Sequence, residues 1–403
     1  MEEEEQPKTP VTVLTGALGA GKTTLIKHVL EKPHGYRVAV IQNEFSTEMG
    51  IEAPLITDAN GNDFKDIYEL PNGCLCCSAK DGLISTLDRL LDERQRFDYV
   101  LVEATGTADP EAICDIFWLD DGLGSLVYLD GVVTLVDGRN ALSSLGDGSP
   151  GAGDAGALGL EVETAKQVAC ADVLLLNKAD VTPEAQRRRI AERLAAMNPT
   201  AVVLESSFSA VPLGSILGIH AFDRGRLSQT LDRLVLPSSS SGPAGKHKFC
   251  SAYDCSSCAV GHTHQGLCQG HDGHDNLIVG DHGIESLLLR STTSLDLYCP
   301  DRVEAWLAQV LWENTAGGVY RCKGLFRAPR QIASDEDGVA DKATAGDEAA
   351  AATSAYALQG VGKLFEVEEA PRAFVSDSKF LFIGRGLQCR ALEDGLRGCL
   401  WQS

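Results

Sequence analysis

The sequence lacks any continuous apolar run of about 18 residues, the length that a membrane-spanning helix requires. It is also poor in basic residues: 35 Lys and Arg stand against 57 Asp and Glu, a formal charge of −22. This deficit argues against a general affinity for nucleic acid, whose phosphates basic side chains must neutralise, and against docking on anionic membranes. Residues 1–5 lack the positive region of a secretory signal, so we expect a cytoplasmic protein.

The chain has 403 residues, 44% of them hydrophobic, which is enough for two or three domains on a prior of about 150 residues per domain. Apolar strand-like runs alternate with helical patterns over residues 11–236, after an acidic tail at 1–10. This alternation predicts an α/β domain with a largely parallel sheet. Residues 237–281 are predicted to be a linker with a His- and Cys-rich tract. Residues 282–403 are predicted to form a smaller α+β domain with a disordered insertion at 331–355.

A glycine-rich loop lies between the first predicted strand and the first predicted helix. Its pattern is Gly16-x4-Gly21-Lys22-Thr23, the P-loop, in which glycines let backbone N–H groups point at phosphate oxygens. In this pattern Lys22 reaches the β- and γ-phosphates and Thr23 is a ligand of Mg²⁺. The residues predicted to bind the nucleotide here are Gly16, Gly19, Ala20, Gly21, Lys22, Thr23 and Thr24. The strand–loop–helix context predicts a P-loop NTPase domain.

A second motif predicts which base is bound. The apolar strand at 173–176 ends in Asn177-Lys178-Ala179-Asp180. The carboxylate of Asp180 can accept hydrogen bonds from N1–H and the 2-amino group of guanine, and adenine has no donors at those positions. Asn177 and Lys178 are expected to brace the base and the P-loop. The sequence therefore predicts GTP rather than ATP as the nucleotide.

A third motif predicts residues that act on the γ-phosphate. The apolar strand at 99–102 ends in Glu103, and Gly106 follows three residues later. A carboxylate at a strand end can hold Mg²⁺ or its water, and Gly106 can offer a backbone N–H to the γ-phosphate. We therefore assign catalytic roles to Lys22, Thr23, Glu103 and Gly106.

Three cysteines stand close together at Cys74, Cys76 and Cys77. Thiolates are soft ligands that suit Zn²⁺ or Cu(I), and three of them leave a fourth coordination position open. Buried free thiols or a redox pair are the alternatives for this segment. Its place between the P-loop and Glu103 makes coupling between metal and nucleotide physically plausible.

Histidines and cysteines are also dense between His247 and His282, where six of the nine His and four of the 13 Cys occur. The pair Cys255-x2-Cys258 has the spacing of zinc ligands, and His-rich tracts bind metals. The rest of the spacing matches no zinc-finger pattern well. Metal binding and a flexible loop with incidental ligands both remain open for this tract.

Taken together, these motifs resemble those of the CobW-like family of P-loop GTPases. The matching segments are 15–24, 43–45, 73–77, 103–110, 177–180, 282–284, 320–324, 359–361 and 382–385. The resemblance implies a GTPase domain followed by the family's smaller α+β C-terminal domain. It implies GTP, Mg²⁺ and Zn²⁺ (or another transition metal) as ligands, with the transition metal on Cys74, Cys76 and Cys77. It also implies transfer of that metal to a client metalloprotein.

The sequence departs from the family pattern at two places. Gln42 stands where members often carry an acid, so no auxiliary metal ligand is carried over to that position. Residues 1–10 lack the Cys-Pro-Glu-Leu docking motif of the eukaryotic zinc-transferring branch, so the client of that branch is not carried over either. No Gln or Arg is evident in the motifs to orient the attacking water, which predicts slow turnover without a partner.

Two other functions stay open at this point. One is a GTPase that serves cobalt insertion in cobalamin synthesis. The other is a passive zinc buffer, in which the tract at 247–282 binds the metal and nucleotide binding is vestigial. Metal-dependent GTP turnover would separate the buffer from the chaperone, and the identity of the client would separate the two GTPases.

Overall fold

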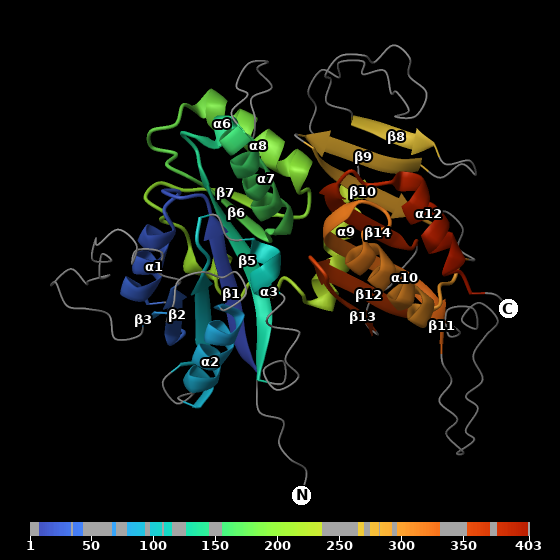
Figure 1. Cartoon of the computed structure of the whole chain (residues 1–403), viewed down its shortest axis with the longest axis horizontal. Helices are drawn as coiled ribbons and strands as arrows, with labels where there is room; N and C mark the ends of the chain where they lie inside the picture. The colour runs from blue at the N-terminus through green and yellow to red at the C-terminus, as the bar shows by residue number, and fades with distance from the viewer. Residues whose placement is uncertain are drawn as a thin grey trace, which may run out of the picture. The chain divides into compact units, whose positions relative to one another are not determined.

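The computed structural model of the chain (Figure 1) describes residues 8–33, 35–42, 67–69, 79–92, 97–106, 109–114, 126–144, 155–235, 265–269, 275–281, 283–291, 296–330, 353–370 and 377–401. The chain folds into two compact units, Met1–Phe222 and Asp223–Ser403.

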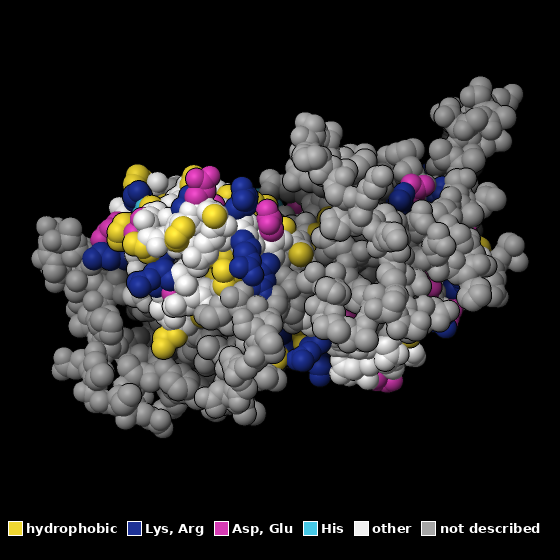
Figure 2. Space-filling view, turned by 90° about the horizontal axis from the view of Figure 1, so that it is seen from above, with side chains coloured by type: hydrophobic (Ala, Val, Ile, Leu, Met, Phe, Trp, Pro, Cys, Tyr) yellow, Lys and Arg dark blue, Asp and Glu magenta, His cyan; other side chains and the backbone are white. Residues whose placement is uncertain are grey.

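On the face seen in Figure 2, Lys and Arg side chains lie among acidic and hydrophobic ones wherever the surface is described. Among the residues that the structure describes, no helix is both long enough and apolar enough to cross a membrane.

The first unit is built on a seven-stranded sheet in the order β3-β2-β4-β1-β5-β6-β7. Every neighbouring pair of strands in it is parallel. The strands are β1 (Thr9–Gly16), β2 (Val38–Gln42), β3 (Ile67–Glu69), β4 (Tyr99–Glu103), β5 (Val127–Asp137), β6 (Val173–Asn177) and β7 (Val202–Glu205). Successive residues of β1 and β6 are buried, so both faces of the sheet are covered. The predicted α/β fold with a parallel sheet is confirmed.

Helices cover this sheet. They are α1 (Lys22–Glu31), α2 (Ala79–Asp92), α3 (Pro110–Cys114), α6 (Ala141–Ser144), α7 (Ala155–Cys170) and α8 (Glu184–Met197). Leu25 and Val29 of α1 pack in one hydrophobic cluster with Leu14 of β1. In α2, Leu83 and Leu87 are fully buried, as their spacing of one helical turn predicts.

The parallel strands bring the predicted site residues to one edge of the sheet. In the register of the sheet, Glu103 lies opposite Leu14 on one side and Gln42 on the other. Asp137 at the end of β5 lies opposite Asn177 at the end of β6. Because parallel strands share the direction of their carboxyl ends, the loops that follow β1, β4 and β6 start from the same edge.

The second unit is built on a seven-stranded antiparallel sheet in the order β13-β12-β11-β14-β10-β9-β8. Its elements are α9 (Arg224–Val235), β8 (Gln265–Gln269), β9 (Asp275–Asp281), β10 (Ile284–Arg290), α10 (Pro300–Glu313), β11 (Gly318–Pro329), β12 (Thr353–Val361), β13 (Leu364–Glu369), β14 (Lys379–Arg385) and α12 (Cys389–Gly398). Val303, Leu307 and Leu311 of α10 pack with Phe380 and Phe382 of β14 in its core. The predicted α+β class of this unit is confirmed.

The first unit begins and ends earlier than the sequence predicts. β1 starts at Thr9, which pairs with Val127, so the first strand overlaps the tail predicted at 1–10. Residues 1–7 lie outside the described part. The helix α9 falls in the second unit, although the first domain was predicted to end at 236. It does so because it packs against β11, and its Asp232 forms an ion pair with Lys379 of β14.

In the second unit, strands occur in the segment that the sequence predicts as a linker with a His- and Cys-rich tract, and in the predicted disordered insertion. β8 and β9 form an antiparallel pair within 237–281, where the sequence predicts a linker and tract. β12 begins at Thr353, inside the insertion predicted at 331–355, because it continues its ladder with β11 as far as Pro329. The remainder of each segment lies outside the described residues.

Candidate nucleotide-binding site

The loop between β1 and α1 depends on its glycines. Gly16, Gly19 and Gly21 have φ angles of 134°, 75° and 111°, which other residues rarely adopt. A Cβ atom on Gly16 would lie 2.4 Å from the carbonyl O of Leu135, and one on Gly21 would lie 2.4 Å from Nδ2 of Asn177. No side chain caps α1, whose N-cap is Gly21. The first N–H groups of α1 are therefore available to an anion.

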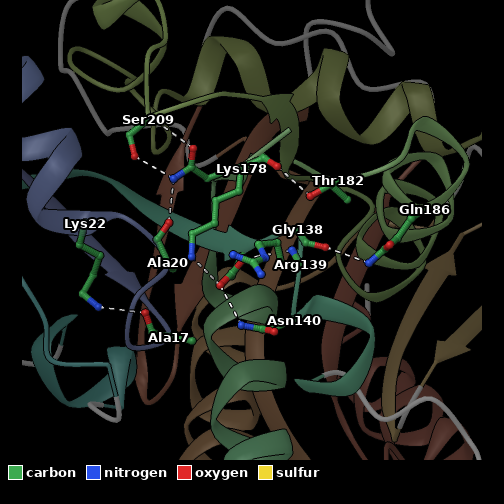
Figure 3. Close-up of polar contacts among 12 residues, drawn as sticks. Ala17, Ala20, Lys22, Gly138, Arg139, Asn140, Lys178, Thr182, Gln186 and Ser209 are labelled. Carbon is green, nitrogen blue, oxygen red and sulfur yellow. Dashed lines mark hydrogen bonds and ion pairs between the residues drawn. The ribbon is translucent and has the colours of Figure 1, made fainter. Parts of the chain in front are cut away.

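Lys22 points back into this loop (Figure 3). Its Nζ donates hydrogen bonds to the carbonyl O of Gly16 at 2.7 Å and of Ala17 at 3.3 Å, and the residue is 7% exposed. Burial lowers the pKa of Lys22, and the negative charge of Glu103 opposes that shift. The ammonium is thus held inside the loop, where phosphate oxygens would be stronger partners for it than neutral carbonyls.

The groups predicted to hold Mg²⁺ come from α1 and β4. Thr23 and Thr24 are exposed on the first turn of α1, so the Thr23 hydroxyl is open to a ligand. Glu103 accepts a hydrogen bond from Nε2 of Gln42 at 2.6 Å. Burial raises the pKa of Glu103, whereas the bond from Gln42 and the charge of Lys22 lower it. A hydroxyl and a carboxylate are the hard oxygen donors that Mg²⁺ prefers, so these residues fit the ion.

Gly106 approaches the P-loop so closely that only glycine fits. A Cβ atom on Gly106 would lie 2.6 Å from the backbone N of Leu18. The carbonyl O of Gly106 accepts a hydrogen bond from Nε2 of Gln167 on α7 at 3.1 Å. The neighbouring Lys166 pairs with Asp109 at 2.9 Å. These contacts from α7 fix the segment after β4 beside the P-loop, and no sequence motif marked them.

Asn177 ties the P-loop to the loop after β7. Its Nδ2 donates to the carbonyl O of Ala20 at 2.8 Å and to Oγ of Ser209 at 2.9 Å. Its Oδ1 accepts from the backbone N of Ser209 at 2.9 Å and from Oγ of Ser206 at 3.1 Å. Sequence reasoning missed Ser206 and Ser209. The signal that could have marked them is the polar, Ser-rich stretch directly after the apolar strand β7.

The next residues form a constrained loop that leads to Asp180. Lys178 has a left-handed φ of 63°, which is uncommon outside glycine. Its carbonyl O accepts a hydrogen bond from Oγ1 of Thr182 at 2.7 Å, and the backbone N of Ala179 donates to the carbonyl O of Ser206 at 3.0 Å. Asp180 itself is exposed at the end of this loop. Its carboxylate is therefore accessible to a base.

The cysteines predicted to bind the transition metal are not among the described residues. Cys74, Cys76 and Cys77 lie outside the described residues, as does most of the tract at 247–282. Within the described residues, no group of three or more His, Cys, Asp and Glu side chains could hold a metal ion. Burial raises the pKa of Cys322 and of Cys399 to about 12, which disfavours the thiolate form that binds metals.

Known proteins resemble the chain over both units. The profile of the family described as CobW/HypB/UreG, nucleotide-binding domain, matches residues 10–205. Zinc-regulated GTPase metalloprotein activator 1 of Schizosaccharomyces pombe is 30% identical over 395 residues, which cover 94% of this chain and 82% of that protein. Zinc chaperone YjiA of Escherichia coli is 38% identical over 216 residues, which cover 53% of this chain and 62% of that protein.

A solved structure shares the fold. The Zn(II)-bound YjiA GTPase from E. coli superposes with a TM-score of 0.59 at 23% identity, over 98% of this chain and 99% of that one. The fold likeness and the extended identity to the S. pombe protein both include the P-loop unit and the antiparallel unit. The chain therefore belongs to the CobW-like family of P-loop GTPases.

Proposed function

We propose that this chain is a GTP-hydrolysing metallochaperone that delivers Zn²⁺ to a client metalloprotein. One observation carries the nucleotide part of the proposal: Lys22, Glu103 and Asn177 come from separate segments and meet at one edge of the parallel sheet. Asn177 holds the carbonyl O of Ala20 in the P-loop, and Glu103 is close enough to Lys22 to oppose the fall in its pKa. This arrangement of Lys22, Glu103 and Asn177 around the P-loop supports binding and hydrolysis of a nucleotide.

Different residues around the P-loop bind the phosphates, the Mg²⁺ ion and the base of GTP. The N–H groups of the loop and of α1, together with Lys22, hold the β- and γ-phosphates. Thr23 and Glu103 would hold Mg²⁺, which neutralises charge on these phosphates when bound. Gly106 packs against Leu18 of the P-loop, which supports a role for its N–H in binding the γ-phosphate. Asp180 is assigned to accept two hydrogen bonds from guanine. No Gln or Arg in the sequence motifs orients the attacking water, so we expect slow turnover without a partner.

The zinc part of the proposal assigns the cargo to Cys74, Cys76 and Cys77. The names of the two relatives, a zinc-regulated GTPase metalloprotein activator and a zinc chaperone, support zinc as the metal. The client is expected to be a metalloprotein that accepts the ion from these thiolates.

The experiment measures GTP and ATP binding by competition, GTP turnover, and zinc content. We expect GTP to be preferred, Lys22→Ala to lose phosphate binding, and Glu103→Ala to bind nucleotide but turn over more slowly. Lys27→Ala is the matched control, because Lys27 lies on the same helix, is exposed and pairs only loosely with Glu31 at 3.9 Å. Equal affinity for ATP and GTP in the wild type would refute the proposal.

Metal transfer separates the remaining functions. Apo-client candidates captured with GTP-loaded protein are tested for zinc uptake, with Co²⁺ in place of Zn²⁺ as a second arm. Preferential transfer of cobalt would identify a cobalt-inserting GTPase. Zinc binding with no GTP turnover and no transfer would identify a passive buffer.

A further inference from the structure

Asp137 contacts the loop after β6 that leads from Asn177 to Asp180. None of the sequence motifs includes Asp137. It is the last residue of β5 and is 7% exposed. Its Oδ1 accepts a hydrogen bond from the backbone N of Arg139 at 3.0 Å, and its Oδ2 accepts one from Nδ2 of Asn140 at 3.0 Å. Oδ2 also accepts a charge-assisted hydrogen bond from Nζ of Lys178 at 2.8 Å (Figure 3). The carboxylate thus joins the turn after β5 to the loop after β6.

The two loops are in close contact at other atoms too. The backbone N of Gly138 donates to the carbonyl O of Asn177 at 3.0 Å. A Cβ atom on Gly138 would lie 2.7 Å from Oγ1 of Thr182 and 2.8 Å from that same carbonyl O. Nε2 of Gln186 on α8 donates to the carbonyl O of Gly138 at 3.1 Å. The turn after β5 therefore forms a rigid support for Asp137.

Lys178 is consequently fixed at both ends. Thr182 holds its carbonyl O, and Asp137 holds its ammonium, while the backbone between them keeps a left-handed φ of 63°. The Lys178 ammonium is thus bound to the end of β5. The P-loop carbonyls are bound by the ammonium of Lys22. With its ammonium held in this way, the Lys178 side chain keeps 31% of its surface exposed, so that its four methylene groups can offer an apolar surface to a flat ring.

We propose that Asp137 is a positioning residue for guanine: by fixing the Lys178 ammonium, it holds the Lys178 stem against the face of the base whose edge Asp180 binds. This inference rests on the proposed function, because it concerns the same nucleotide. The contact between Asp137 and Lys178 orders the base site before the nucleotide binds. Binding therefore costs little side-chain entropy at this site. Asp137 itself does not touch the nucleotide.

The test compares Asp137→Asn, Lys178→Met and the double variant for affinity toward GDP and toward pyrophosphate, which has no base. Asn keeps an acceptor for Arg139 but loses the charge, and Met keeps the stem of Lys178 but loses the ammonium. Each single variant should weaken GDP binding about threefold to tenfold, the scale of a partly exposed ion pair. Pyrophosphate binding should stay as in the wild type. The double variant should be no weaker than Lys178→Met alone, because both changes break one interaction.

Asp172→Asn is the matched control. Asp172 is also 7% exposed, and it accepts a hydrogen bond from the backbone N of Val132 at 3.0 Å at the opposite end of β6. Asp172→Asn should leave GDP affinity unchanged.

Unchanged GDP affinity in Asp137→Asn, additive losses in the double variant, or an equal loss for pyrophosphate would each overturn the inference. If Asp137→Asn does not fold, the same ligand comparison on Lys178→Met decides it. A wild type that binds ATP as well as GTP would instead refute the proposed function.

Discussion

Gln42 donates a hydrogen bond to the carboxylate of Glu103 at 2.6 Å, across the neighbouring strands β2 and β4. This contact assigns a role to the residue that departs from the family pattern. A hydrogen bond to the ionised form favours that form. Gln42 therefore favours the ionised form of Glu103 and opposes burial, which raises the pKa of that carboxyl.

The first prediction concerns pH. Gln42→Leu removes the donor, so the pKa of Glu103 should rise. The ionised carboxylate is the form that binds Mg²⁺, so turnover falls as the pH drops through this pKa. The acidic limb of the kcat–pH profile should therefore move to higher pH in Gln42→Leu, with little change on the alkaline side. Coincident profiles for wild type and variant would remove Gln42 from this role.

The second prediction separates two glycines of the P-loop. Gly19→Ala meets no atom within 4 Å, so only left-handed backbone strain lowers its free energy of unfolding, by about 1 kcal/mol. Gly21→Ala adds a Cβ atom 2.4 Å from Nδ2 of Asn177 and 2.7 Å from Oγ of Ser209. Because those groups are hydrogen-bonded to each other, the loss should reach about 2–4 kcal/mol. Urea unfolding without nucleotide checks this order, and equal losses would contradict it.

The fold and the local motifs were predictable because each depends on neighbours in sequence. Gly16 to Lys22 and Asn177 to Asp180 follow apolar strands, and strand–loop–helix patterning predicts the parallel sheet. Thr353 to Ala355 are predicted to belong to the insertion because they continue its Ala-rich composition, whereas in the structure they pair with β11 and begin β12.

The contacts that complete the site could not be predicted in the same way. Gln42 reaches Glu103 only because β2 and β4 are neighbours in a sheet whose order differs from the sequence order. Ser209 reaches Gly21 over 188 residues of chain, with a hydrogen bond of 3.0 Å. Such partners are set by topology rather than by local spacing. A single sequence gives the type of each residue but not the strand order that brings them together.

The third prediction concerns the choice of base. Asp180→Asn replaces the carboxylate that accepts from guanine, so GTP binding should weaken by about 2–3 kcal/mol, the scale of a charge-assisted hydrogen bond. Xanthine has a carbonyl where guanine has its amino group, and the amide of the variant can donate to it. The variant should therefore bind xanthosine triphosphate better than the wild type does. Competition binding with both nucleotides measures this, and a parallel loss for both would contradict the assigned role.

The last prediction is that zinc and nucleotide are coupled. β3 ends at Glu69, opposite Gln42 in the sheet, and Gln42 in turn contacts Glu103, so the strand that precedes Cys74, Cys76 and Cys77 in the sequence adjoins the nucleotide edge. If the γ-phosphate changes this edge, zinc affinity must differ between the GTP and GDP forms, and zinc must shift the GTP/GDP preference by the same factor.

A useful chaperone needs that factor to be roughly 5–150-fold, the usual range of such coupling. Zinc is titrated against a competing chelator with GDP and with a non-hydrolysable GTP analogue, and affinity should also fall as thiols protonate at lower pH. A triple Cys→Ser variant at Cys74, Cys76 and Cys77 should lose the coupled site. The control Cys255→Ser/Cys258→Ser, which leaves β8 intact, should keep it. Equal zinc affinity in both nucleotide states would mean that zinc binding and GTP hydrolysis are independent, and a triple variant that retains the site would place the metal elsewhere in the chain.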